Sequence, residues 1–187
     1  VDFGSVDMSY KPPSGEELRP APAGAAHFLE HLLFDKESGD ISERFNDLGS
    51  EVDAQTSFTT TEFAVTFSDS FHSNVALLLE TALVSHFTDE GVRRERDIIR
   101  REINLYAEEV EWACFSAAMD ALYRGQLVGK DVAGSVESLL EIDRSVLEGC
   151  HHTFYHPERM SMYICGDVGA EETAAETSRL WETYARF

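Results

Sequence analysis

The sequence predicts one α+β domain in which a mainly antiparallel sheet is flanked by helices. Two neighbouring stretches alternate apolar with polar residues and are rich in Thr, Val and Phe, which is typical of paired strands. Most other stretches repeat apolar residues every three or four positions, as amphipathic helices do. The 187 residues, 43% of them hydrophobic, suffice for a substantial core. Because no repeat or linker interrupts the chain, we expect residues 1–187 to form a single domain.

The first part of the chain predicts strands and helices around a loop. Residues 1–7 have strand character, and the Pro- and Gly-rich stretch over 11–24 predicts a loop. The elements expected next are helices over 25–35 and 41–49 and strands over 51–59 and 61–69.

The second part of the chain is predicted to be mainly helical. A helical stripe over 73–87 is followed by a long charged helix from about Asp89 to Glu109. The run RMSMYICGDV, residues 159–168, predicts a buried strand. The remaining predicted helices cover 112–124, 135–141, 143–155 and 170–187.

The chain carries a strong excess of negative charge, with 15 Lys and Arg against 35 Asp and Glu and a formal net charge of −20. Such a field repels phosphate backbones, so we expect no nucleic-acid partner; it suits a cytosolic surface or one that attracts basic ligands. No segment is apolar over the length of a bilayer and no signal peptide opens the chain, so we expect no membrane association. The opening VDFGSVDMSY does not begin with a Met and resembles a strand entered midway, which predicts a piece of a longer protein.

The three cysteines, Cys114, Cys150 and Cys165, are an odd number without a CxxC pair. This pattern indicates neither a disulfide framework nor a thiolate metal cluster. A reducing, cytoplasmic compartment is the simplest interpretation, and we expect all three side chains to be buried as small apolar groups.

Three ionisable residues stand together in the apolar stretch AGAAHFLEHLLFD: His27, Glu30 and His31. In a helix the two histidines, four positions apart, point the same way and can reach one ion, with Glu30 beside them. This is the H-x-x-E-H pattern of the inverted zincins, in which two imidazoles hold zinc and a carboxylate lies near the water on the metal. The alternative is a chance occurrence, but three polar groups aligned on one helix face, each costly to bury alone, favour the metal site.

A catalytic zinc needs three protein ligands, so a third must come from elsewhere in the chain. Glu95 and Glu102 lie two helical turns apart on one face of the predicted charged helix. Spacing alone does not choose Glu102 over its neighbours, and Glu108, Glu109 and Glu111 fit a solvated face. The apolar residues by which this helix can dock on the core are Ile98, Ile99, Ile103 and Leu105.

Several stretches resemble the pitrilysin/insulysin family of zinc metallopeptidases, which includes the mitochondrial processing peptidase. GAAHFLEHLLF is similar to the family's metal helix, and ERDIIRREI to its downstream glutamate helix. The later stretches GSVESLLEI, FYHPERM and YICGDV follow in the order found in that family, so the resemblance runs from about residue 3 to 170. It is strongest to the bacterial cytosolic branch, and it implies the first domain of the metal-binding half.

The resemblance implies a zinc endopeptidase acting on peptides or small unfolded proteins, with one Zn²⁺ per chain. His27, His31 and Glu102 would bind the metal, and Glu30 would be the general base on the zinc-bound water. Glu95 would orient a ligand histidine. The peptide substrate would add as a strand along residues 51–59, pairing through Asp53 and Ala54.

Two departures from the family pattern concern the substrate. Asp53 stands where relatives carry Asn, and Gln55 stands where they carry an aromatic residue. The resemblance also implies a partner, a second homologous half or chain, which would complete the cleft. The alternative function is a non-catalytic scaffold or partner subunit of the same family, although that role predicts an eroded motif and all four motif residues are present.

A second histidine cluster, His151, His152 and His156, raises the alternative of a further metal site. Adjacent histidines on a helix do not converge on one ion, and His156 precedes Pro157 at a predicted helix end. Packing at a helix end is therefore the favoured interpretation of this cluster.

Overall fold

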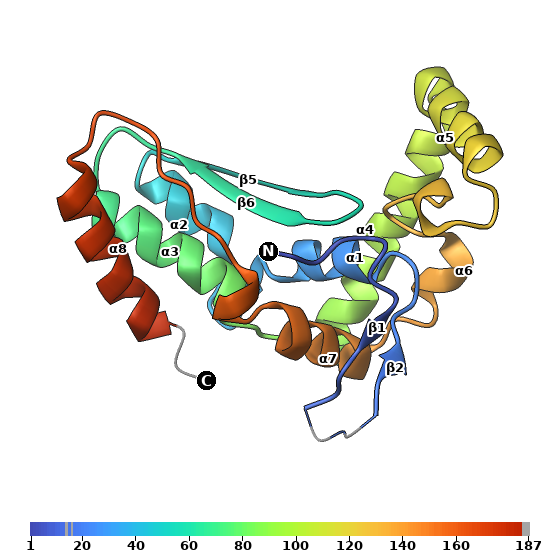
Figure 1. Ribbon diagram of the computed structural model, residues 1–187, viewed down its shortest axis with the longest axis horizontal. Helices are drawn as coiled ribbons and strands as arrows, with labels where there is room; N and C mark the ends of the chain where they lie inside the picture. The colour runs from blue at the N-terminus through green and yellow to red at the C-terminus, as the bar shows by residue number, and fades with distance from the viewer. Residues whose placement is uncertain (14, 16, 185–187) are drawn as a thin grey trace.

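Two arms diverge from a common base in this protein (Figure 1). The computed structural model describes residues 1–13, 15 and 17–184. One arm consists of the strands β5 (Glu51–Thr56) and β6 (Thr61–Thr66) and the helices α2 (Ile41–Asp47), α3 (Phe71–Leu83) and α8 (Ala170–Tyr184). The other arm consists of the helices α4 (Asp89–Glu108) and α5 (Val110–Leu122), and between the arms lies the helix α1 (Ala25–Leu32).

Short elements connect the larger ones. They are β1 (Ser9–Tyr10), β2 (Arg19–Pro20), β3 (Asp35–Lys36), β4 (Gly39–Asp40), η1 (Leu127–Gly129), α6 (Val136–Leu139), α7 (Arg144–Phe154) and η2 (Pro157–Arg159). Within the described residues the strands pair as β1–β2, β3–β4 and β5–β6, each pair antiparallel. The predicted α+β class with antiparallel strands is confirmed, although these strands form separate pairs and no continuous sheet.

All of the predicted helices form, with ends shifted by a few residues. The helix predicted over 170–187 is observed as α8 as far as Tyr184, and residues 185–187 lie outside the described residues. The predicted loop over 11–24 contains the short strand β2, and its positions 14 and 16 also lie outside the described residues.

The hairpin β5–β6 forms where the alternating residues predict it. Its register ends with Thr56 opposite Thr61, and residues 57–60 make the turn. Burial alternates along β5, where Val52, Ala54 and Thr56 are half-buried and the residues between them are exposed. Because α1 and α2 both contact β5, the half-buried face of the strand is the one that covers these helices.

Helix α1 is short and deeply buried. Its side chains Phe28, Leu29 and Leu32 have no exposed surface. The preceding Gly24 has a φ of +89°, and a Cβ there would lie 2.4 Å from the Ala133 carbonyl oxygen. Only glycine combines this backbone conformation with so close an approach, so the entry of the chain into α1 is fixed by a neighbouring loop.

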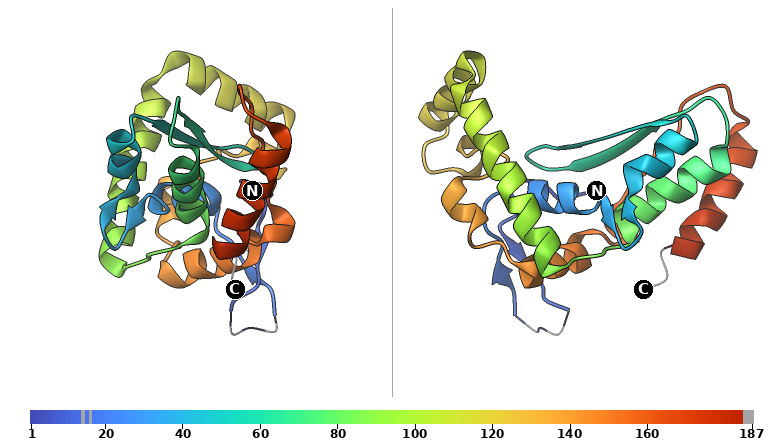
Figure 2. Two further views of the ribbon diagram at one scale, coloured as in Figure 1. Left: turned by 90° about the vertical axis from the view of Figure 1, so that its left-hand side faces the viewer. Right: turned by 180° about the vertical axis from the view of Figure 1, so that it is seen from behind.

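Helix α4 extends from the base to α5 and passes beside α1 (Figure 2, right). Ile99 is fully buried against the core and Ile103 is partly buried there. These two residues dock the helix as predicted. The other two predicted docking residues, Ile98 and Leu105, are 36% and 59% exposed, because neither shares the buried side of Ile99 and Ile103; Ile98 instead lines a cavity together with Glu30 and His31.

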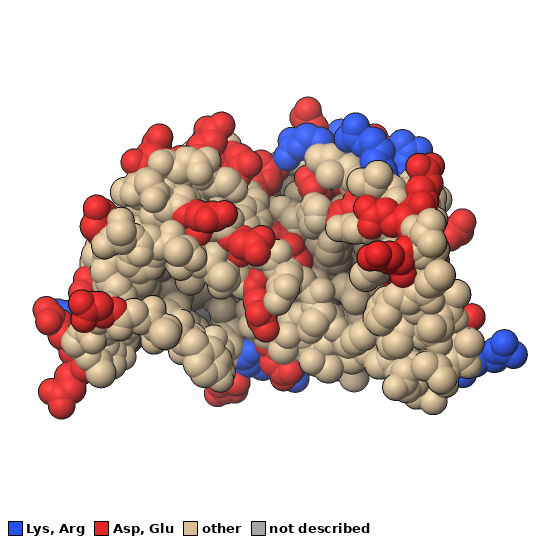
Figure 3. Space-filling view, turned by 90° about the horizontal axis from the view of Figure 1, so that it is seen from above, with Lys and Arg blue, Asp and Glu red and all other residues tan. Residues whose placement is uncertain are grey.

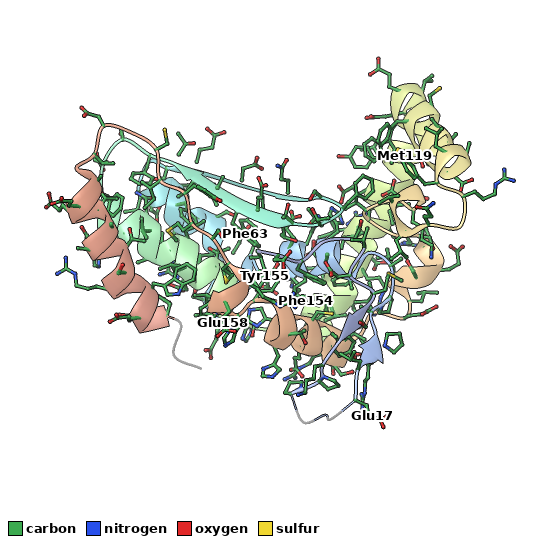
Figure 4. The ribbon with its side chains drawn as sticks, in the orientation of Figure 1. Glu17, Phe63, Met119, Phe154, Tyr155 and Glu158 are labelled. Atoms are coloured by element: carbon green, nitrogen blue, oxygen red, sulfur yellow. The ribbon has the colours of Figure 1, made fainter. Side chains whose placement is uncertain are left out.

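Aromatic side chains fill the base below the hairpin. The ring of Phe3 stacks on Phe154 with 4.0 Å between centroids, and the ring of Tyr155 meets Phe63 edge-on at 6.3 Å. Phe63 comes from β6, whereas Phe154 and Tyr155 come from the end of α7 (Figure 4). Segments far apart in the sequence are therefore joined under the strands that cover α1.

The buried strand predicted over 159–168 is wrong. Residues 160–164 belong to no strand, and Tyr163 and Ile164 are 92% and 39% exposed. A strand forms only with a hydrogen-bonded neighbour. Here a cavity of about 1010 Å³, lined by residues of both segments, lies between residues 160–164 and β6. The segment therefore has no neighbouring strand to pair with on that side.

The strand predicted over residues 1–7 is also wrong, although the chain start is close to the hairpin. The Val1 amine donates to the Thr61 carbonyl at 2.8 Å, and Thr61 N–H donates to the Val1 carbonyl at 3.1 Å. Asp2 N–H donates on the other side to the Arg159 carbonyl at 2.8 Å. The start of the chain thus lies between β6 and residue 159, but the paired stretch is too short to count as a strand.

The cysteines divide into two groups. Cys150 is buried in α7, as predicted, whereas Cys114 and Cys165 are exposed. The prediction of burial fails for Cys114 because α5 has no buried residue, and for Cys165 because its segment forms no buried strand.

Candidate metal centre

His27 and His31 come from α1 and face α4. The apolar residues of α1 occupy the core side, which leaves the two histidines together on the side that α4 passes. Their ring centroids are 4.5 Å apart. The structure therefore brings the two imidazoles together, as the four-residue spacing predicts.

Glu102 of α4 completes a group of three donors. His27 Nε2 lies 3.8 Å from Glu102 Oε1, and His31 Nε2 lies 3.5 Å from Glu102 Oε2. Within the described residues these three are the group whose donor atoms all lie within 4.8 Å of one another. Ligands of a tetrahedral zinc, at bonds of about 2.0–2.2 Å, lie about 3.3 Å apart, so the donor set fits zinc after small movements.

Glu95 holds the second histidine from one side. His31 Nδ1 and Glu95 Oε1 are 2.9 Å apart, so the imidazole N–H donates to the carboxylate. That bond fixes the tautomer in which Nε2 carries the lone pair that faces Glu102. Burial alone would lower the pKa of His31, but the hydrogen bond to Glu95 and the nearby carboxylate of Glu102 leave it raised above its ordinary value.

His27 has a different environment from His31. Burial lowers its pKa to about 3, with the neighbouring His31 acting in the same direction, so the imidazole is neutral and able to bind a metal. Its Nδ1 atom is buried and has no hydrogen-bond partner among the described residues. His27 therefore lacks the outer hydrogen bond that Glu95 gives to His31.

Glu30 is buried between α1 and the hairpin, with 7% of its surface exposed. The hydroxyl of Thr56 donates to Glu30 Oε2 at 2.5 Å. Burial raises the pKa of this carboxyl group, and the Thr56 hydrogen bond and His31 only partly oppose the rise. A carboxylate with a raised pKa is a stronger proton acceptor near neutral pH.

The predicted substrate residues adjoin the donor group. Asp53 and Ala54 line a cavity of about 660 Å³ together with Glu30 and His31. The Asp53 side chain is on the exposed face of β5, whereas Ala54 is half-buried. Gln55 does not line this cavity, and its amide donates instead to Glu62 across the hairpin at 3.2 Å.

Sequence reasoning missed Thr56, the hydrogen-bond partner of Glu30. The available signal was its position two residues after Ala54, which places both side chains on the same face of the strand. That signal becomes informative only once the hairpin is known to cover α1.

The second histidine cluster packs at the end of α7. His151 is buried, stacks on Tyr155 with 5.0 Å between centroids, and lies with Nε2 3.0 Å from the Ala82 carbonyl oxygen. Burial lowers the pKa of His151 to about 4. His156 Nδ1 accepts a long hydrogen bond of 3.4 Å from Glu158 N–H at the start of η2. The cluster is thus held by packing and backbone contacts.

Acidic side chains spread across the middle of the face seen from above, while a group of Lys and Arg side chains lies along one border (Figure 3). The one arginine that lines the cavity beside the donor group, Arg94, is paired with Asp35 at 2.6 Å. Among the described helices, none combines the length and the apolar character needed to cross a membrane.

Comparison with known proteins gives one family. The sequence profile described as "Insulinase (Peptidase family M16)" matches residues 19–136, a range that contains His27, Glu30, His31 and Glu102. A Bacillus subtilis protein named an uncharacterized zinc protease, YmfH, is 36% identical over 169 residues, which cover 90% of this chain and 40% of that protein. The chain therefore spans about two fifths of the length of this relative.

Solved structures show the same fold. The crystal structure of an M16-like peptidase from Alicyclobacillus acidocaldarius superposes with a TM-score of 0.90 at 33% identity, covering 97% of this chain and 43% of that one. An M16 domain from Pseudomonas fluorescens that is described as inactive superposes with a TM-score of 0.78 at 15% identity, covering 100% of this chain and 44% of that one. At that identity the second likeness concerns the fold alone.

Proposed function

Because the chain belongs to the insulinase family, peptidase family M16, we propose that it is the metal-binding domain of a zinc endopeptidase that hydrolyses peptides or small unfolded proteins. The observation that carries the proposal is the group formed by His27, His31 and Glu102 with the buried Glu30 beside it. A non-catalytic partner subunit has no need of this complete set of residues, so catalysis is the better supported function.

In this proposal one zinc ion per chain is held by His27, His31 and Glu102, while Glu95 keeps His31 in the binding tautomer. Zinc, when bound, supplies a Lewis acid and lowers the pKa of a coordinated water toward about 7. Three protein ligands leave a fourth position open, which is the arrangement of catalytic zinc sites.

Glu30 is the general base in the proposed reaction. Its carboxylate takes a proton from the attacking water as the water oxygen bonds to the scissile carbonyl carbon. Glu30 then passes that proton to the peptide nitrogen as the carbon–nitrogen bond breaks, so the products are a free acid and a free amine. The raised pKa of the buried carboxyl group suits both transfers.

The substrate is proposed to bind as an added strand along the free edge of β5. One edge of β5 pairs with β6, and the other edge has no strand partner among the described residues. Ala54 offers backbone groups next to the cavity that Glu30 and His31 line, and Asp53 places a negative charge there. Backbone pairing accepts many sequences, whereas Asp53 favours a basic side chain on the peptide.

The complete enzyme is proposed to be longer than this chain. The relative described above is matched over only 40% of its length, which supports a second homologous half or a partner chain that closes the cleft. Within that enzyme, residues 1–187 are the domain that carries the zinc ligands. We also assign the enzyme to the cytoplasm, because Cys114 and Cys165 are exposed free thiols, as a reducing compartment allows.

The test is the variant Glu30→Gln in the complete protein. We expect zinc content to stay at the wild-type level, because Glu30 is not a ligand, while cleavage of an internally quenched peptide falls by about a hundred- to ten-thousandfold. Glu108→Gln, at an exposed position on α4, is the matched control and should change neither quantity. Wild-type hydrolysis by Glu30→Gln would contradict the proposed mechanism.

A further inference from the structure

Thr56 is the residue that holds Glu30 in place. It ends β5, and its side chain lies on the half-buried face that covers α1. Its hydroxyl lies 2.5 Å from Glu30 Oε2, a length typical of a hydrogen bond to an ionised acceptor. This is the one hydrogen bond that the Glu30 side chain makes among the described residues, and it leaves Oε1 without a partner.

The hydroxyl groups of Thr56 and Thr61 each have a single proton to donate. Thr61 is fully buried and gives its single hydroxyl proton to the Phe3 carbonyl at 2.9 Å. Thr61 lies 3.4 Å from the Thr56 hydroxyl, so toward Thr56 it can only accept. Thr56 also has one hydroxyl proton, and the shorter contact to the Glu30 carboxylate takes it. The bond therefore runs from Thr56 to Glu30.

We propose that Thr56 is a positioning residue for catalysis: its hydroxyl fixes Oε2 of Glu30, so that Oε1 is the oxygen that receives the proton of the attacking water. The inference rests on the proposed peptidase function and adds to it a residue outside the H-x-x-E-H motif. Thr56 lies two residues after Ala54 on the same strand. The strand proposed to bind the peptide thus also sets the orientation of the base.

The test compares Thr56→Val with Thr56→Ser in the complete protein. Valine keeps the size and β-branching of threonine but removes the hydroxyl, and serine keeps the hydroxyl. We expect Thr56→Val to lower kcat by about 10- to 100-fold, the usual cost of losing an outer hydrogen bond at a metal site, with KM and zinc content unchanged. Thr56→Ser should keep kcat near the wild-type value, because the hydroxyl that donates to Glu30 is retained.

A matched control and a second readout make the test specific. Thr66→Val removes an exposed hydroxyl from the other strand of the same hairpin, one that makes no hydrogen bond among the described residues, and should leave kcat unchanged. Crystal structures of the two Thr56 variants should show the Glu30 carboxylate turned away from its wild-type orientation in the valine variant only.

Two results would overturn the inference. One is a wild-type kcat for Thr56→Val, and the other is an equal loss in the valine and serine variants, which would show that the hydroxyl is not the cause. Absence of peptidase activity in the wild-type complete protein would instead overturn the proposed function. In that case the orientation of Glu30 in the two crystal structures still decides whether Thr56 positions it.

Discussion

Glu102 supplies the donor group with its only charged oxygen ligand, and its side chain is 26% exposed. Its two carboxylate oxygens lie 3.8 Å from His27 Nε2 and 3.5 Å from His31 Nε2, and Glu102 is the one carboxylate of the donor group. Glu95, on the same helix, contacts His31 through the other ring nitrogen. The two glutamates therefore differ in their proposed roles: Glu102 is a zinc ligand, and Glu95 orients the ligand His31.

The variant Glu102→Gln tests whether Glu102 is a zinc ligand. An amide is a poorer zinc ligand than a carboxylate, and loss of an outer hydrogen bond alone costs about 10- to 100-fold in metal affinity, so we expect loss of at least about a hundredfold here. The measurement is zinc affinity by competition with a chelator. Glu108→Gln is the control and should bind zinc like the wild type. A loss of zinc affinity in Glu108→Gln, with wild-type affinity in Glu102→Gln, would instead assign the third ligand to Glu108.

At the scale of elements, the position of Glu102 depends on how α4 docks beside α1. Ile99 is fully buried at this contact and lies one turn from Glu102. Replacing it by alanine leaves a cavity between the helices. The stability of the fold and the geometry of the metal site are thus linked through one side chain.

We expect Ile99→Ala to lower the free energy of unfolding by about 2–5 kcal/mol and to weaken zinc retention as well. Leu105→Ala, at a position 59% exposed on the same helix, is the control and should change stability by less than about 0.5 kcal/mol. Urea unfolding of the apo and zinc-loaded proteins measures both effects. Equal stability of the two variants would show that α4 is not held by Ile99.

The elements that sequence could predict are those whose signal is local. Helices α1 and α4 follow from apolar spacing, and the His27–His31 pair follows from that of α1. The choice of Glu102 needed the resemblance to a family, because the rotation of α4 on α1 depends on which isoleucines are buried. Residues 159–168 have the composition of a strand, but a strand also needs a neighbour, and their sequence cannot supply one.

At the scale of the whole molecule, the two arms leave part of the structure open. The free edge of β5 and the cavity beside the donor group are on one side of the hairpin, and the larger cavity of about 1010 Å³ is beside β6. The first opening suits a substrate strand. The second is lined by both apolar and polar residues of β6, α3 and the segment 159–168.

The first residues of the chain pair with β6 at one end of the larger cavity. Val1 and Thr61 exchange two hydrogen bonds, the pattern of an antiparallel pair, and Asp2 bonds to Arg159 on the other side. Burial lowers the pKa of the Val1 amine at this contact. Beyond it, residues 161–164 pair with no strand among the described residues.

We expect hydrogen exchange to distinguish the paired and the unpaired sides of this cavity. The amide of Thr61, which donates to the Val1 carbonyl at 3.1 Å, should exchange slowly, whereas the amides of residues 161–164, which lie in no strand, should exchange fast. Amides of α1, which are buried and hydrogen-bonded, are the internal control for slow exchange. Slow exchange of residues 161–164 would show that they pair as a strand in solution, as the sequence predicts for residues 159–168.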